Sequence, residues 1–201
     1  MRGWRKSEVG GDGMRILVLQ ASPNEDGLTA SMAKEVMAGA QAAGAETELV
    51  HMRKLKLGAC LACEDGWGRC RREGLCIIED DLEVLRDKVA KADGVVLSTP
   101  VYFGDVAEVV KSFFDRLRRC ERAGPAEPRA EGRWALGIGA AGGSGGGGPS
   151  CLTAMERYFA HLAMPIFDQM AVTRRSRDYM LSAARGAGER MVKHIEEERA
   201  E

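Results

Sequence analysis

Four cysteines are concentrated in one stretch of 17 residues in the first half of the chain. They are Cys60, Cys63, Cys70 and Cys76, and their spacing is C-x2-C-x6-C-x5-C. Four thiolates so close together match the number of ligands that a [4Fe–4S] cluster or a structural zinc ion takes. Free thiols in a loop that folds over a ligand are the third interpretation, because cysteines in a reducing compartment are seldom bridged. The spacing alone leaves these three interpretations open.

The other two cysteines and the three histidines do not extend this pattern. Cys120 ends an expected amphipathic helix, and Cys151 lies at the start of another, so a packing role is favoured for both. The histidines are scattered over three different elements and indicate no joint site. No catalytic acid or base is predicted, because the loops considered next present neither a histidine nor a suitable pair of carboxylates.

A second candidate site is the loop that follows the first apolar run. Residues 21–30 read ASPNEDGLTA and open a helix, whose free backbone N–H groups and dipole attract a phosphate. No Lys or Arg lies between Gln20 and Ala33, so dipoles and side-chain donors would hold the anion. The alternative is an ordinary turn capped by Asp26 or Thr29. The residues predicted to bind the phosphate end of a ligand are Ser22, Asn24, Gly27, Leu28, Thr29 and Ala30.

Two further loops could form flat surfaces. Residues 99–105 read TPVYFGD, with two adjacent aromatics in a chain whose aromatic content is only 5%. Residues 142–148 hold six glycines, whose backbone can lie flat against a planar group and donate N–H groups to it. A hydrophobic lid or subunit contact for the first loop, and a flexible linker for the second, are the alternatives. The predicted ligand-binding residues are Pro100, Val101, Tyr102, Phe103 and Gly104 in the first loop and Ala141, Gly142, Gly143 and Ser144 in the second.

The elements around these loops alternate between apolar runs and amphipathic segments. Strands are expected at residues 15–20, 46–52, 94–98, 134–138 and 166–173, and helices at 28–44, 80–92, 105–121, 150–163 and 178–200. This alternation predicts an α/β fold, a parallel sheet with helices on both faces. Five strands fit the flavodoxin-like doubly wound three-layer sandwich of order 2-1-3-4-5, whose ligand lies beyond the carboxyl ends of the strands at the switch point.

In that topology the loops after strands one, three and four meet at one edge of the sheet. A phosphate end, an aromatic wall and a glycine-rich wall together match flavin mononucleotide, FMN. The motifs of competing sites are absent: no G-x-G-x-x-G follows the first strand, no Lys-Ser/Thr follows the glycine-rich loop, and there is no G-x-S-x-G. A phosphoreceiver domain would need carboxylates at the ends of strands one and three, and none is there.

Length and charge exclude several other classes of protein. The 201 residues suffice for one domain, expected at residues 14–201 after a flexible leader at 1–13. The net charge of -1 gives no basic field for nucleic acid or an anionic membrane. No apolar run approaches the roughly 18 residues of a membrane span, and no secretory signal is recognisable, so a cytoplasmic location is expected.

Three segments carry a resemblance to a known family. ASPNEDGLTA resembles the phosphate loop of the NADPH-dependent FMN reductases, and STPVYFGDVAEVVKSFFDRL resembles their second flavin loop and its helix. The segment C-x2-C…GLCIIEDD resembles the cysteine loop of the related iron–sulfur flavoproteins. Over about residues 14–170, the resemblance implies bound FMN and electron transfer. The donor would be NAD(P)H or an iron–sulfur partner, and the acceptor a quinone, a flavin or a similar compound. An iron–sulfur electron carrier and a non-enzymatic module of the same fold are the alternatives.

A homodimer or homotetramer is also expected. Residues 53–79 form a loop longer than the roughly 12–15 residues usual for a structureless connection, and it carries Trp67 and the four thiols. Tyr102 and Phe103 would leave an apolar patch on a monomer. The related flavoproteins assemble in this way, with the flavin near a subunit boundary. The alternative is that the loop folds back on its own domain.

Overall fold

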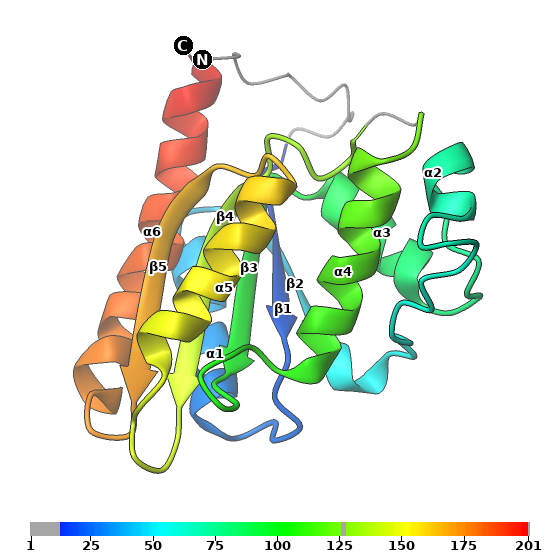
Figure 1. The fold of residues 1–201 in the computed structure, drawn as a ribbon. Coiled ribbons are helices and arrows are strands. Elements are labelled where there is room, and N and C mark those ends of the chain that lie inside the picture. Colours follow the sequence, from blue (N-terminus) through cyan, green and yellow to red (C-terminus); the bar gives the residue numbers. More distant parts are fainter. Residues whose placement is uncertain (1–12, 126–127, 201) are drawn as a thin grey trace.

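The computed structural model describes residues 13–125 and 128–200, so the first twelve residues of the expected leader lie outside it. Five strands form one sheet in the order β2-β1-β3-β4-β5, and every neighbouring pair is parallel, which confirms the predicted topology (Figure 1). The strands are β1 (Arg15–Gln20), β2 (Glu46–His51), β3 (Gly94–Pro100), β4 (Trp134–Ala141) and β5 (Ile166–Thr173).

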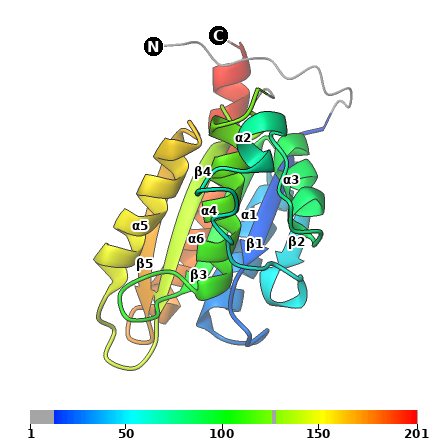
Figure 2. The ribbon, with the colours of Figure 1, turned by 45° about the vertical axis from the view of Figure 1, so that its right-hand side comes forward.

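Helices cover both faces of this sheet, as Figures 1 and 2 show from two sides. One face is covered by α3 (Leu82–Lys91), α4 (Glu108–Arg122) and α5 (Gly148–His161), and the other by α1 (Leu28–Ala42) and α6 (Arg177–Ala200). A separate apolar core lies in each of the two interfaces between sheet and helices. Two short elements were not predicted, the 3-10 turn η1 (Met52–Lys54) and α2 (Arg69–Glu73). Segments this short contain too few residues to show a hydrophobic periodicity.

Helices α1 and α6 pack backbone against backbone. A Cβ atom added at Gly39 would lie 1.9 Å from the carbonyl oxygen of Arg185, and one at Gly188 would lie 2.1 Å from that of Val36. Because only glycine fits at both positions, the two helices approach closely along this face. Their amino-terminal ends are also joined, since Arg177 Nη2 donates a hydrogen bond to Ser31 Oγ at 3.1 Å. The loop after β1 and the loop after β5 therefore lie next to each other.

Candidate functional site

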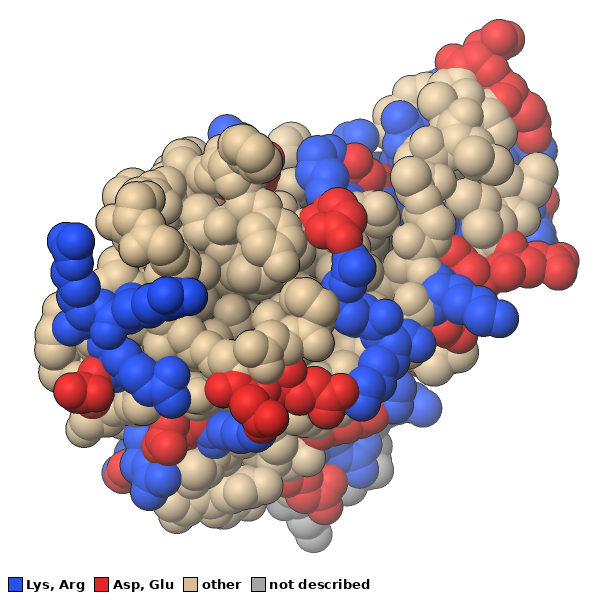
Figure 3. Space-filling view, turned by 90° about the horizontal axis from the view of Figure 1, so that it is seen from below, with Lys and Arg blue, Asp and Glu red and all other residues tan. Residues whose placement is uncertain are grey.

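The loops at the carboxyl edge of the sheet enclose one open cleft of about 910 Å³. Figure 3 views this edge and shows a mostly uncharged hollow with charged side chains around its rim. The volume falls within the ~300–1,000 Å³ typical of cofactor sites. The loops after β1, β3 and β4 all contribute, as the topology predicted. The predicted ligand-binding residues that line the cleft are Ser22, Asn24, Gly27, Leu28, Thr29, Pro100, Val101, Tyr102, Phe103, Gly104, Gly142, Gly143 and Ser144.

Two predicted residues do not line the cleft. Ala30 in the first turn of α1 and Ala141 at the end of β4 are each only 2% exposed. Their small apolar side chains pack in the protein interior, and the binding of the ligand by these two residues stays a prediction. The structure adds five residues to the lining that the sequence analysis did not single out. They are Ala140, Gly146, Gly147, Ser150 and Arg174.

The loop after β1 is shaped by its own side chains. Ser22 Oγ accepts a hydrogen bond from the backbone N–H of Asn24 at 3.1 Å, and Asn24 Oδ1 accepts one from that of Asp26 at 2.9 Å. Gly27 is the N-cap of α1, and no side chain caps the helix. The cap by Asp26 or Thr29, which was the alternative interpretation of this loop, is therefore absent. The first N–H groups of α1 are left to an incoming anion, for which a helix amino terminus is suited.

The loop after β3 ends in a tight turn that displays an aromatic ring. Tyr102 and Asp105 exchange two backbone hydrogen bonds, each 2.9 Å long, across Phe103 and Gly104. Both of these central residues have positive φ, 52° for Phe103 and 78° for Gly104. A left-handed phenylalanine costs roughly 1–2 kcal/mol, and such strain collects at functional sites. The turn holds the Phe103 side chain fully exposed at the cleft.

The glycine-rich loop after β4 is packed against this turn. A Cβ atom at Gly147 would lie 2.7 Å from the Cα of Gly104, and Ser150 Oγ donates a hydrogen bond to the Gly104 carbonyl at 2.8 Å. The segment is therefore a fitted part of the site and not a free linker. On its other side, nothing lies within 4 Å of a Cβ atom built at Gly142 or Gly143. This leaves an open, flat backbone surface, as a planar ligand requires.

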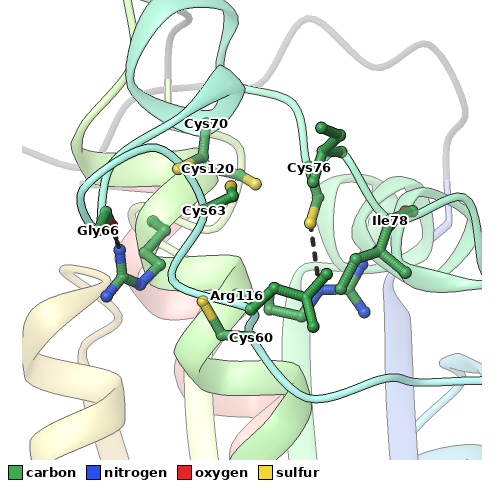
Figure 4. Close-up of a pocket in the computed structure, with 11 residues that line it drawn as sticks. Cys60, Cys63, Gly66, Cys70, Cys76, Ile78, Arg116 and Cys120 are labelled. Atoms are coloured by element: carbon green, nitrogen blue, oxygen red, sulfur yellow. Dashed lines mark hydrogen bonds between the residues drawn. The ribbon is translucent and has the colours of Figure 1, made fainter.

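A second, small cavity is lined by five cysteines, as the close-up in Figure 4 shows. It brings together the four predicted thiols and Cys120 of α4, and its other lining atoms are mainly apolar. All six cysteines of the chain are free. Within residues 13–125 and 128–200, no three His, Cys, Asp or Glu side chains are arranged to hold a metal ion. The thiols are thus gathered around one cavity without forming a finished metal site.

Cys120 was assigned to packing, and its place in this cavity was missed. Its contact with the cysteine loop depends on how α4 packs, which no local sequence pattern reveals. Burial raises the pKa of Cys120 to about 12, so its thiol is neutral. Cys76 Sγ accepts a hydrogen bond from Arg116 Nε at 3.3 Å, which orients this thiol toward α4.

Two arginines of α4, the buried Arg116 and the half-buried Arg119, hold the cysteine loop on its own domain. Arg116 forms two hydrogen bonds with Asp80, of 2.6 and 2.9 Å, and also bonds to the carbonyl of Gly58. The guanidinium of Arg119 stacks on Trp67, with its carbon 4.4 Å from the centroid of the ring. No residue of the segment 53–79 lines the carboxyl-edge cleft. The loop therefore contacts its own domain through these residues and lies away from the cleft, and the expected homo-oligomer stays a prediction.

Comparison with known proteins agrees with this geometry. The family model described as NADPH-dependent FMN reductase matches residues 14–176. An iron-sulfur flavoprotein of Methanocaldococcus jannaschii is 33% identical over 105 residues, which are 52% of each chain. One of Methanosarcina thermophila is 31% identical over 109 residues, 53% of this chain and 55% of that protein. The chain thus spans about half the length of the curated relatives that it matches.

Solved structures show the same fold at low sequence identity. An NAD(P)H:quinone oxidoreductase from Methanothermobacter marburgensis superposes with a TM-score of 0.70 and 17% identity, covering 89% of this chain and 96% of that one. A WrbA-like flavodoxin from Agrobacterium tumefaciens gives a TM-score of 0.63 and 16% identity over 92% of this chain and 99% of that one. Among the described residues, no helix is both long and apolar enough to cross a membrane.

Proposed function

This chain belongs to the NADPH-dependent FMN reductase family, and from that premise we propose that it binds FMN in the carboxyl-edge cleft and transfers electrons. The donor is NAD(P)H or an iron–sulfur partner, and the acceptor is a quinone, a flavin or a similar compound. The observation that carries the proposal is the convergence in one cleft of an uncapped helix terminus, an aromatic turn and an open glycine surface. FMN, when bound, supplies the redox chemistry, and the protein supplies binding and orientation.

Each wall of the cleft has its own task in this proposal. The first N–H groups of α1 bind the phosphate, with Ser22, Asn24 and Thr29 as side-chain donors. The backbone of Gly142 and Gly143 lies against the ring, and N–H groups there stabilise the negative charge that reduction places on it. Of the described residues that line the cleft, none is His, Asp or Glu, so we assign no general acid or base.

Titration of the protein with FMN tests the proposal. We expect binding in the micromolar range or tighter, measured by quenching of flavin fluorescence, and oxidation of NADPH or NADH in the presence of a quinone. A folded protein that binds no FMN would instead be a non-enzymatic module of this fold. A protein that binds FMN but oxidises neither nucleotide would require a protein electron donor.

The cysteine cavity supports a second proposal, that Cys60, Cys63, Cys70 and Cys76 hold a [4Fe–4S] cluster. Soft thiolates in an apolar pocket suit such a cluster, although the side chains must rearrange to reach it. The protein should be purified without oxygen and analysed for iron, acid-labile sulfide and zinc. Equal iron and sulfide that both disappear in Cys63→Ser would support the cluster. Zinc alone would make the site structural, and the absence of all three would leave free thiols.

We also propose a cytoplasmic homodimer or homotetramer with the flavin near the subunit boundary. The exposed ring of Phe103 beside the half-exposed Tyr102 supports a contact at this edge, and six free thiols suit a reducing compartment. Sedimentation at micromolar concentration decides the oligomeric state. A dimer that dissociates in Phe103→Asp would support the interface, whereas a 21.8 kDa monomer that still holds FMN would contradict it.

A further inference from the structure

We infer that Arg174, in the loop after β5, supplies the positive charge that binds the phosphate of the ligand. This inference rests on the proposed function, because it takes the phosphate of FMN to lie at the amino terminus of α1. It adds a residue from the carboxyl-terminal part of the sequence to the phosphate-binding part of the cleft, which the loop after β1 was expected to form alone.

The loop after β1 carries negative charge of its own. Between Gln20 and Ala33 there is no Lys or Arg, while Glu25 and Asp26 lie directly before the N-cap of α1. A phosphate at this terminus would lie near two carboxylates. The helix dipole provides only about half an elementary charge, so a phosphate dianion calls for a further cation.

The lysines nearest to this loop are already engaged with its acidic residues. Lys54 Nζ lies 2.6 Å from Glu25 Oε1, and the hydrogen bond from Lys54 lowers the pKa of Glu25. Lys34 Nζ lies 3.8 Å from Asp26 Oδ1 and donates a hydrogen bond to the Glu25 carbonyl at 3.3 Å. These two lysines offset the charge of Glu25 and Asp26, so neither lysine is available to pair with the phosphate.

Arg174 fills this gap because it lines the same cleft as Asn24, Gly27 and Thr29. It is the one Lys or Arg among the described residues of that lining, and among the described residues no carboxylate forms an ion pair with it. In Figure 3, basic side chains gather on the side of the hollow where β5 passes into α6. A guanidinium matches a phosphate particularly well, because its planar fork donates two parallel hydrogen bonds.

The turn that carries Arg174 is built to hold it in place. Ser176 Oγ accepts a hydrogen bond from the backbone N–H of Thr173 at 2.9 Å, and Thr173 Oγ1 accepts one from that of Ser176 at 3.2 Å. Ser176 is only 8% exposed, so this pair of bonds anchors the turn in the protein. The bond from Arg177 to Ser31 then fixes the turn beside the first turn of α1. Arg174 is thereby presented to the cleft before any ligand arrives.

The test compares the affinities of FMN and riboflavin, which differ only in the phosphate. Arg174→Ala should weaken FMN binding about 10- to 100-fold, the range for lost charge-assisted hydrogen bonds, and change riboflavin binding less than about 2-fold. Arg175→Ala is the matched control, because Arg175 is exposed in the same turn but does not line the cleft. It should leave both affinities unchanged, and circular dichroism should show that both variants are folded.

The other outcomes overturn the inference in distinguishable ways. Equal losses for FMN and riboflavin in Arg174→Ala would mean that Arg174 acts on the ring or on the loop and not on the phosphate. Unchanged FMN binding in Arg174→Ala would show that the helix terminus suffices alone. A wild-type protein that binds neither flavin would refute the proposed function itself, and this inference with it.

Discussion

Replacing Gly188 of α6 by alanine should destabilise the protein, because this residue lies where α6 crosses α1. The added Cβ atom would be 2.1 Å from the carbonyl oxygen of Val36 and 3.1 Å from the backbone nitrogen of Ala40. Ordinary van der Waals contact begins at 3.4 Å, and both neighbours are backbone atoms that cannot rotate away. The helices would therefore have to separate by more than an ångström along a face where Met32 and Met191 are fully buried.

Two opposing effects set the size of the loss. Alanine is favoured over glycine inside a helix by about 1 kcal/mol. Overpacking that moves backbone costs about 3 kcal/mol or more, the upper part of the usual range. The free energy of unfolding should thus fall by about 2 kcal/mol, which for a protein of this size lowers Tm by roughly 4–8 °C.

Gly186→Ala is the matched control in the same helix. Gly186 is exposed, and nothing lies within 4 Å of a Cβ atom built there, so only the gain in helix propensity remains. Thermal unfolding of ligand-free protein, followed by circular dichroism, should show Tm above the wild type for Gly186→Ala and below it for Gly188→Ala. If Gly188→Ala unfolded at or above the wild-type temperature, the close packing of α1 on α6 would be refuted.

Three further predictions follow from the two sites and the core. Gly143→Val should lower flavin occupancy after purification, because a branched side chain would enter the open face of the cleft at a residue whose φ is 42°. Full flavin occupancy with unchanged activity would contradict the placement of the flavin ring against Gly143. Burial raises the pKa of Cys151 to about 12, so iodoacetamide at pH 8 should label this residue only after denaturation. Rapid labelling of Cys151 in the folded protein, detected by mass spectrometry, would contradict its burial. Burial acts to raise the pKa of Asp80, but hydrogen bonds from Arg116 and from backbone N–H groups outweigh it and lower the pKa. The ion pair of Asp80 with Arg116 therefore stabilises the fold at any pH above the ordinary Asp pKa of about 3.9. This contribution is lost as the pH falls through the lower pKa that Asp80 has in the folded protein. Urea unfolding between pH 7 and pH 3 should show a smaller acid-dependent loss in Asp80→Asn, and an equal loss would refute the role of the pair.

The alternation of apolar and amphipathic segments was enough to predict the sheet and its order. The ends of the strands and helices were harder to predict, because contacts with neighbouring elements determine where each one begins and ends. β3 and β4 continue to Pro100 and Ala141, where pairing with β4 and β5 still supports them. α4 begins at Glu108 and not at residue 105, because Asp105 is held in the turn with Tyr102.

The candidate cleft was predictable to the extent that topology brings loop ends together. The residues after β1, β3 and β4 could be named because each loop has an unusual composition. Arg174 was overlooked because the loop after β5 has no such signature, although it ends at the same edge. Cys120 was overlooked for a different reason, since a residue 44 positions beyond Cys76 joins that cavity only through the packing of α4.

The contact between α1 and α6 also affects how the protein can be made. The apolar face of α1 is complete by residue 42, whereas α6 begins at Arg177, so a ribosome adding about 5–20 residues per second needs roughly 7–27 s to pass from one to the other. During that interval Met32, Val36 and Ala40 have no partner helix and are exposed to aggregation. Partly synthesised chains that expose apolar surface in this way are the usual clients of chaperones. Because the start of α6 also fixes the turn that carries Arg174, the cleft acquires this part of its lining only after α6 has been synthesised.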